Sequence, residues 1–268
     1  MKRALLIDLD GTLLDDQNKI SVFNQKMINQ ARQAGWQVYL VTGKSFQHSY
    51  QFYKKLGLDS WFITSAGQVI SRKNEIVWQK TISFLALKKL FNEPILNQNV
   101  DDFMVQTAQQ ILATNPNSPV IGPLFGQKIP VKKIAWNTPF QAIGCYFTVK
   151  KQAKLTVSKI TQTLSRQYKT DLDFHPWEIW PEKTIIHVVP SQVSKYTAFM
   201  KVKKWDQITY TVVFGNGRND IPLFKKADLS YAMLGSTPEV VSYATSVSNY
   251  DNNHSGVGRE IQKLLKLL

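Results

Sequence analysis

The chain has 268 residues, and 33 lysines and arginines against 19 aspartates and glutamates give it a net charge of +14. Its 43% hydrophobic content excludes global disorder, and a single cysteine, Cys145, excludes internal disulfides and favours a reducing, cytoplasmic location. No apolar stretch approaches the roughly 18 residues that a membrane helix needs, so we expect no membrane insertion.

The excess of positive charge is open to more than one interpretation. The basic residues form pairs spread along the chain, from Lys54 and Lys55 to Lys225 and Lys226, without an arginine-rich tail. This distribution favours a solvated basic surface, and next a field that attracts small anionic substrates. A nucleic-acid partner is the least favoured interpretation, and nothing in the sequence indicates an oligomeric state.

Short apolar runs, each followed by polar residues or glycine, predict strands that are buried on both faces. Helical spacing of apolar residues separates several of these runs and predicts amphipathic helices. Alternation of such strands with helices is typical of a doubly wound α/β fold with a parallel sheet. The predicted strands are 4–7, 38–41, 61–63, 210–214 and 229–233, and the predicted helices are 21–35, 46–57 and 257–268.

The middle of the chain departs from this pattern. Residues 142–150 alternate between apolar and mixed positions, which predicts a strand with one face exposed to water. An amphipathic helix through Ile160 and Leu164 follows, and residues 115–119 predict a loop. We therefore expect an α+β module at 82–187, inserted into an α/β domain made of 1–81 and 188–268.

Two carboxylates, Asp8 and Asp10, follow the first predicted strand directly. Side chains in this position repel each other unless a cation or a proton intervenes, and Mg²⁺ prefers such oxygen ligands. An aspartate can also act as a nucleophile on phosphorus. The alternative is a polar loop with a helix-capping aspartate, but Gly11 and Thr12 after a buried strand favour a functional site.

A second polar segment, Thr42 to Ser45, follows the next strand. Its hydroxyl and backbone N–H groups can surround an oxyanion, although an ordinary helix cap is the alternative. Lys195 starts a later predicted helix. A lysine on a helix is ordinarily solvated, so its importance depends on whether it lies near the carboxylates.

The segment from Gly215 to Asp220 follows the fourth predicted strand. It does not fit a dinucleotide-binding fingerprint, because Asp220 stands where a third glycine is needed. It instead offers Asn216, Asn219 and Asp220 as oxygen ligands on a tightly bending loop, with a turn rich in asparagine and aspartate as the alternative.

Together these four segments resemble the motifs of the haloacid dehalogenase-like (HAD) phosphatases, Cof-type branch, in their order and spacing. The resemblance covers essentially the whole chain. It implies a Rossmann-like core and a large C2-type cap, here 82–187, that selects the leaving group. The matching segments are 8–14, 42–43, 195 and 215–220.

The resemblance also implies a role for each site residue. Asp8 would attack phosphorus, and Asp10 would protonate the leaving alcohol and later activate water. The phosphoryl oxygens would be bound by Thr42 and Lys195, and substrate binding would be assisted by Gly11, Gly43, Lys44 and Asn219. Mg²⁺ would be held by Asp8, Asp10, Asn216 and Asp220. We therefore expect a Mg²⁺-dependent phosphatase that acts through an aspartyl phosphate on a small phosphorylated metabolite, and most of all on a sugar phosphate. The alternatives are a sugar phosphomutase and a catalytically weakened protein that binds phosphometabolites or nucleic acid.

Three positions depart from the family pattern. Asn216 replaces a metal-binding aspartate, Lys44 replaces a frequent arginine, and Ala66 replaces a frequent asparagine. Loss of the carboxylate at position 216 predicts weaker binding of Mg²⁺. Lysine at position 44 keeps the charge but loses the two-point grip of a guanidinium group.

The expected cap contains one distinctive aromatic segment, 175–181, with Trp177 and Trp180. These rings could stack on a sugar or a base, although packing in the core is the more frequent role of aromatic side chains. The histidines outside this segment, His48, His187 and His254, have no metal-ligand spacing, so we expect them in the core or at the surface.

Overall fold

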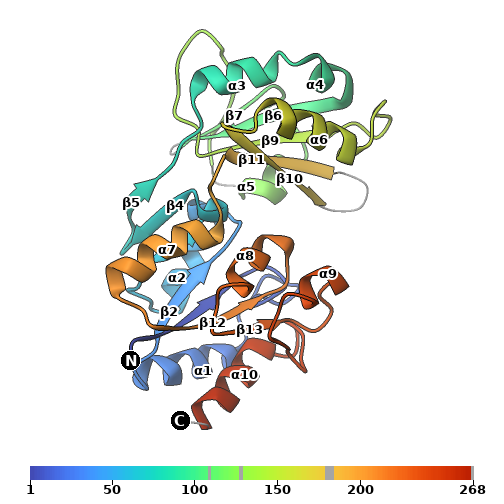
Figure 1. The fold of residues 1–268 in the computed structure, drawn as a ribbon. Helices are drawn as coiled ribbons and strands as arrows, with labels where there is room; N and C mark the ends of the chain where they lie inside the picture. Colours follow the sequence, from blue (N-terminus) through green and yellow to red (C-terminus); the bar gives the residue numbers. More distant parts are fainter. Residues whose placement is uncertain (108–109, 127–128, 179–183, 267–268) are drawn as a thin grey trace. The chain divides into compact units, whose positions relative to one another are not determined.

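A computed structural model describes residues 1–107, 110–126, 129–178 and 184–266, and the contacts within it divide the chain into two units (Figure 1). The first unit consists of Met1–Trp78 and Ser194–Leu268, and the second of Gln79–Val193. The chain therefore leaves the first unit once and returns to it once.

The first unit is built on an eight-stranded sheet in the order β14-β13-β12-β1-β2-β3-β4-β5. Neighbouring strands from β14 to β3 are parallel, and β4 is antiparallel to β3. The five predicted runs are confirmed as β1, β2, β3, β12 and β13, whereas β14, β4 and β5 were not predicted. The bounds are β1 Arg3–Ile7, β2 Gln37–Val41, β3 Phe62–Thr64, β4 Val69–Arg72, β5 Glu75–Gln79, β12 Tyr210–Gly215, β13 Leu229–Ala232 and β14 Ser246–Val247.

Helices cover both faces of this sheet, as expected of a doubly wound fold. Apolar side chains of α1, α2 and α10 pack with Leu5, Ile7 and Leu40 on one face. Those of α7, α8 and α9 pack with Leu6 and Val41 on the other. The bounds are α1 Val22–Gln33, α2 Phe46–Lys55, α7 Lys195–Asp206, α8 Ile221–Phe224, α9 Pro238–Val241 and α10 Gly256–Lys266.

Helix α1 shows how local sequence sets these elements. The Ser21 hydroxyl accepts a hydrogen bond from the backbone of Asn24, which caps the helix, and Gly35 follows its end with a φ of 85°. The buried Asn24 side chain in turn accepts a hydrogen bond from the backbone N–H of Gly258, at 2.8 Å. Because Gly258 has no side chain, α10 lies directly against α1 (Figure 1).

The second unit holds a six-stranded sheet in the order β10-β11-β9-β6-β7-β8. Helices α3, α4 and α6 pack on one face, and the short helix α5 packs on the other. The predicted helix through Ile160 and Leu164 is confirmed as α6, and residues 115–119 form a turn region. The bounds are α3 Phe84–Phe91, α4 Pro94–Asn99, β6 Val100–Gln106, β7 Ile111–Ala113, α5 Ile121–Phe125, β8 Val131–Lys133, β9 Gly144–Val149, α6 Val157–Gln167, β10 Leu172–Glu178 and β11 Thr184–Pro190.

One prediction for the second unit is wrong. The strand predicted at 142–150 is present as β9, but all six of its residues are buried, so it has no face exposed to water. The reason is a second apolar cluster, in which Tyr146 packs with Phe125 of α5 and Ile185 of β11. A short helix of low periodicity thus covers the face that the alternating pattern had assigned to solvent.

Within the described part of the chain, the longest helices have 12 residues, and none combines the length and the apolar character that would let it cross a bilayer.

Candidate active site

The polar segments singled out in the sequence converge at the carboxyl ends of neighbouring strands in the first unit. Asp8 follows β1, Thr42 follows β2, and Asn216 follows β12, so all three leave the same edge of the sheet. Lys195 is the first residue of α7, which packs on the sheet face next to these strand ends. The structure therefore brings together segments that lie about 200 residues apart in the chain.

Lys195 connects two carboxylates at the centre of this site. Its ammonium nitrogen lies 2.7 Å from Oδ1 of Asp8 and 2.7 Å from Oδ1 of Asp220. All three side chains are buried, Lys195 completely. The alternative of a solvated lysine is therefore wrong, because α7 begins with this side chain directed at the strand ends.

Burial and charge act in opposite directions on these groups. Burial raises the pKa of Asp8 to about 7, with Lys195 opposing the shift and Asp220 adding to it. For Lys195, burial acts to lower the pKa, but the carboxylates of Asp220 and Asp8 outweigh it and raise the pKa. The lysine is therefore held as a cation, while Asp8 lies among more negative charge than one ammonium group neutralises.

Asp220 is tied to its own loop as well as to Lys195. Its second oxygen, Oδ2, accepts hydrogen bonds from the backbone N–H groups of Asn216 and Gly217, at 3.1 and 3.0 Å. A side chain at Gly215 would come within 2.5 Å of the same carboxylate, which explains the glycine there. Both oxygens of Asp220 thus accept hydrogen bonds that fix the loop and Lys195.

Asp10 has a different partner. The ammonium nitrogen of Lys44 lies 2.8 Å from Oδ1 of Asp10, and the Asp10 side chain is 43% exposed, whereas that of Lys44 is 12% exposed. Solvent therefore reaches the Asp10 carboxylate, while Lys44 fixes its orientation. The structure thus places Lys44 against Asp10, a contact that the sequence did not reveal.

Asn216 lies over the loop that follows Asp10. Its side-chain oxygen accepts a hydrogen bond from the Thr12 hydroxyl at 3.3 Å. The Asn216 amide is packed so closely on Gly11 that a β-carbon there would come within 2.2 Å of its nitrogen. Gly11 also has a φ of 65°, so both conformation and space require glycine.

Thr42, Gly43 and Asn219 lie close together at these strand ends. Thr42 is fully buried, and its hydroxyl accepts a hydrogen bond from the backbone N–H of Lys44 at 3.1 Å. The Asn219 side chain comes within 3.5 Å of where a β-carbon of Gly43 would lie. This side of the site offers hydroxyl, amide and backbone N–H groups, which suit an oxyanion.

A comparison with known families agrees with this arrangement. The profile of the haloacid dehalogenase-like hydrolases matches residues 5–261. The chain is a haloacid dehalogenase-like hydrolase. The family and the enzyme class expected from the motifs are therefore confirmed.

Two relatives and one solved structure are similar to this hydrolase over nearly the whole chain. Pyridoxal phosphate phosphatase YbhA of Escherichia coli is 24% identical over 97% of each chain. The 5-amino-6-(5-phospho-D-ribitylamino)uracil phosphatase YcsE of Bacillus subtilis is 22% identical over 97% of this chain and 94% of its own. A haloacid dehalogenase-like hydrolase from Bacteroides thetaiotaomicron shares the fold, with a TM-score of 0.81 at 17% identity over 98% of this chain and all of its own.

The turn after β3 supports the candidate site in a way that the sequence did not reveal, although Ala66 was noted there as a departure from the family pattern. Ser65 and Ala66 adopt left-handed backbone conformations, with φ of 49° and 54°. Their backbone N–H groups donate to the carbonyls of Lys44 and Thr42, at 2.7 and 3.1 Å. The following Gly67 lies against the Ser194 carbonyl, where a β-carbon would come within 2.2 Å. This turn therefore braces both the Thr42 loop and the start of α7.

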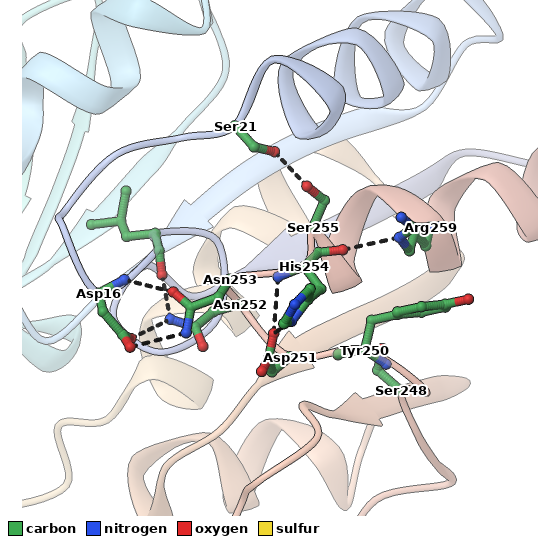
Figure 2. Close-up of polar contacts among 11 residues, drawn as sticks. Asp16, Ser21, Ser248, Tyr250, Asp251, Asn252, Asn253, His254, Ser255 and Arg259 are labelled. Carbon is green, nitrogen blue, oxygen red and sulfur yellow. Dashed lines mark hydrogen bonds and ion pairs between the residues drawn. The ribbon is translucent and has the colours of Figure 1, made fainter.

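A second missed feature is the loop before α10, shown in Figure 2. The side-chain amides of Asn252 and Asn253 donate to the Asp16 carboxylate at 3.0 and 2.9 Å, and Asn252 also donates to the Leu14 carbonyl at 2.9 Å. Leu14 is bridged to Asp10 by a β-type contact. The loop thus holds the segment that carries Asp10, and the asparagine pair was the only signal of it in the sequence.

The donor set fits a hard cation that keeps part of its water shell. Within the described residues, no three His, Cys, Asp or Glu side chains converge closely enough to hold a metal ion. A cation would therefore need the amide oxygen of Asn216 together with Asp8 and Asp10. Such a sparse set of oxygens suits Mg²⁺, which is ordinarily held by one or two carboxylates, waters and substrate phosphate.

Two of the histidines named from the sequence lie in the core and at the surface, as expected. His187 is buried in the second unit and stacks on Tyr146, and His254 is exposed, with its ring 2.7 Å from Oδ1 of Asp251. Trp180 lies outside the described residues, and the side chain of Trp177 is not among those described. The proposed stacking role of these two tryptophans stays a prediction.

Proposed function

We propose that this hydrolase is a phosphatase that removes the phosphate group from a small phosphorylated metabolite, with a sugar phosphate as the favoured substrate. The observation that carries the proposal is the position of Lys195, which holds the Asp8 carboxylate at 2.7 Å within a buried, polar strand end. A cation beside a nucleophilic carboxylate can bind the phosphoryl oxygens and offset their charge during attack.

In the proposed reaction, an oxygen of Asp8 attacks phosphorus in line with the leaving alcohol. The bond from phosphorus to the alcohol oxygen breaks, Asp10 gives that oxygen a proton, and an aspartyl phosphate forms on Asp8. Asp10 then takes a proton from water as the water attacks phosphorus. This second step breaks the bond between phosphorus and the Asp8 oxygen, restores Asp8 and releases inorganic phosphate.

The other site residues have supporting roles in this proposal. Thr42, Gly43 and Asn219 would bind the phosphoryl oxygens together with Lys195, while Lys44 orients Asp10. Asp8, Asp10 and Asn216 would hold Mg²⁺, which when bound neutralises phosphate charge. Asp220 acts as a positioning residue for Lys195, since both of its oxygens already accept hydrogen bonds.

The substrate class rests on chemistry and on relatives. Two full-length relatives are named for small phosphorylated compounds, pyridoxal phosphate and a phosphoribitylamino uracil. We propose that the second unit serves as the cap that selects the leaving group. A cytoplasmic location is consistent with the single, unpaired and buried Cys145.

The test is phosphate release from an aryl phosphate and from a panel of sugar phosphates, pyridoxal phosphate and nucleotide monophosphates, with and without Mg²⁺. We expect metal-dependent release that Asp8→Asn and Asp10→Asn each abolish in a folded protein. Asn29→Asp, on the exposed face of α1, serves as the surface control and should keep full activity.

Three results would contradict the proposal. Appearance of an isomerised sugar phosphate without free phosphate would indicate a phosphomutase instead. Thermal stabilisation by phosphometabolites without any turnover would indicate a binding protein that has lost catalysis. Retained phosphate release in Asp8→Asn would exclude this residue as the nucleophile.

A further inference from the structure

The ionised side chains of the site carry less negative charge than a tightly held divalent cation requires. Asp8 and Asp220 share the single ammonium group of Lys195, and Asp10 is paired with Lys44. With every carboxylate ionised, these five side chains therefore carry one net negative charge. Asn216 contributes an oxygen but no charge.

The hydrogen bonds restrict the site further. Oδ1 of Asp220 accepts from Lys195 and Oδ2 accepts from two backbone N–H groups, and the side chain is only 1% exposed. A cation that displaced these hydrogen bonds would leave Lys195 and the loop without Asp220 as their partner. The oxygens that remain for a cation are the second oxygen of Asp8, the Asp10 group and the Asn216 amide, whose oxygen already accepts a bond from Thr12.

We propose that in this chain a divalent cation and the phosphate group bind as a strongly coupled pair, because Asn216 leaves the protein one negative charge short of neutralising the cation. The proposal rests on the proposed phosphatase function and concerns the ligands of that same site. Phosphate oxygens supply the missing anionic ligand, as Mg²⁺ bound through few carboxylates requires. The cation alone binds weakly, and so does phosphate alone.

Coupling of this kind is reciprocal. If phosphate tightens the binding of Mg²⁺ by a given factor, Mg²⁺ must tighten the binding of phosphate by the same factor. We expect a factor of about ten or more, within the range usual for coupled sites. Asn216→Asp adds the absent charge in an isosteric side chain, so it should strengthen the binding of Mg²⁺ alone and reduce the coupling.

The test is calorimetric titration of MgCl₂ into the full chain at neutral pH, with and without a few millimolar inorganic phosphate. Asp8→Asn provides the blank for direct association of Mg²⁺ with phosphate in solution. For the wild type we expect the Mg²⁺ dissociation constant to fall about tenfold or more when phosphate is present. For Asn216→Asp we expect Mg²⁺ alone to bind about tenfold more tightly and phosphate to add at most about a threefold gain. Asn29→Asp adds the same charge on the surface of the same unit and should behave as the wild type.

Two results would overturn the inference. The first is an equal Mg²⁺ dissociation constant with and without phosphate in the wild type. The second is an Asn216→Asp variant, folded by circular dichroism, whose Mg²⁺ affinity and coupling match those of the wild type. These measurements do not depend on turnover, so the two proposals can fail separately. Coupled binding without hydrolysis would support this inference and contradict the phosphatase proposal. Hydrolysis without coupled binding would support the phosphatase proposal and contradict this inference.

Discussion

The ammonium nitrogen of Lys195 lies 2.7 Å from Oδ1 of Asp220, and both side chains are almost completely buried. Removing the cation would leave Asp220 and Asp8 as unpaired carboxylates in the interior. We therefore expect Lys195→Met to lower the free energy of unfolding by about 3–5 kcal/mol and to abolish phosphate release. Urea denaturation and a phosphate assay measure the two effects.

Lys204→Met is the matched control, because Lys204 is exposed on the same helix, α7, and its loss should cost about 0.5 kcal/mol at most. The double variant Lys195→Met with Asp220→Asn should be more stable than Lys195→Met alone, since it removes one of the stranded charges. A Lys195→Met protein as stable as the wild type would contradict this view of the cluster.

Lys44 is expected to act through Asp10, to which it is joined at 2.8 Å. Lys44→Met should lower kcat by roughly ten- to a hundredfold, because a proton donor that loses its orientation transfers the proton less often. Lys44→Arg keeps a cation within reach of Asp10 and should stay within a few fold of the wild type. Steady-state kinetics distinguish a role of Lys44 in orienting Asp10 from a role in substrate binding. A raised KM with unchanged kcat would mean that Lys44 serves binding alone.

Gly67 is expected to be essential to the start of α7. A methyl group at this position would come within 2.2 Å of the Ser194 carbonyl, next to Lys195, and the φ of Gly67 is 101°. Gly67→Ala should therefore lower both thermal stability and phosphate release, the latter by about tenfold or more. Gly35→Ala is the control, since Gly35 has a φ of 85° but no atom within 4 Å of the added carbon. Equal losses in the two variants would assign the effect to backbone strain alone.

The loop of Figure 2 should influence catalysis from outside the site. Asn252→Ala removes the bonds to Asp16 and to the Leu14 carbonyl, so we expect about 1 kcal/mol lower stability and a lower kcat with little change in KM. Asn249→Ala, at an exposed position of the same loop region, should have neither effect. An unchanged kcat in a destabilised Asn252→Ala protein would restrict this loop to a structural role.

The second unit should lose stability in acid because of His187. Burial, with a smaller contribution from His175, lowers the pKa of His187 from 6.5 to about 3. A histidine whose pKa is lower in the folded state stabilises the fold above pH 6.5 and loses that contribution as the pH falls toward 3.

We expect His187→Phe, which can keep the stacking on Tyr146, to reduce the loss of stability between about pH 7 and about pH 5 by about 2 kcal/mol. Urea denaturation at the two pH values measures it. An identical pH dependence in variant and wild type would show that this histidine does not titrate as its burial implies.

The parallel core could be predicted from the sequence because its strands carry continuous apolar runs and end in polar motifs. Their positions after predicted strands were enough to predict that Asp8, Thr42 and Asn216 would lie at one edge of the sheet, whereas the place of Lys195 beside them was implied only by the family resemblance. The covered face of β9 could not be predicted, because it depends on packing by Phe125, a residue from a distant and weakly patterned helix.

The contacts between side chains of the site could not be predicted from the sequence, for a related reason. Spacing can place Lys44 and Asp10 at adjacent strand ends, but their 2.8 Å contact depends on how two loops bend in space. The conformation of the turn at Ser65 and Ala66 could not be predicted, because neither residue type normally indicates a left-handed backbone conformation.

The order of strands in the core also bears on how the chain folds. Strand β1 lies between β2 and β12, with Arg3 paired to Tyr210, so the middle of the sheet cannot close until a segment about 200 residues downstream has been synthesised. Until then one edge of β1 has no partner and can pair wrongly with other chains. The intervening unit, whose described strands pair only with one another, can fold during this interval, so we expect it to reach its native structure first on the ribosome.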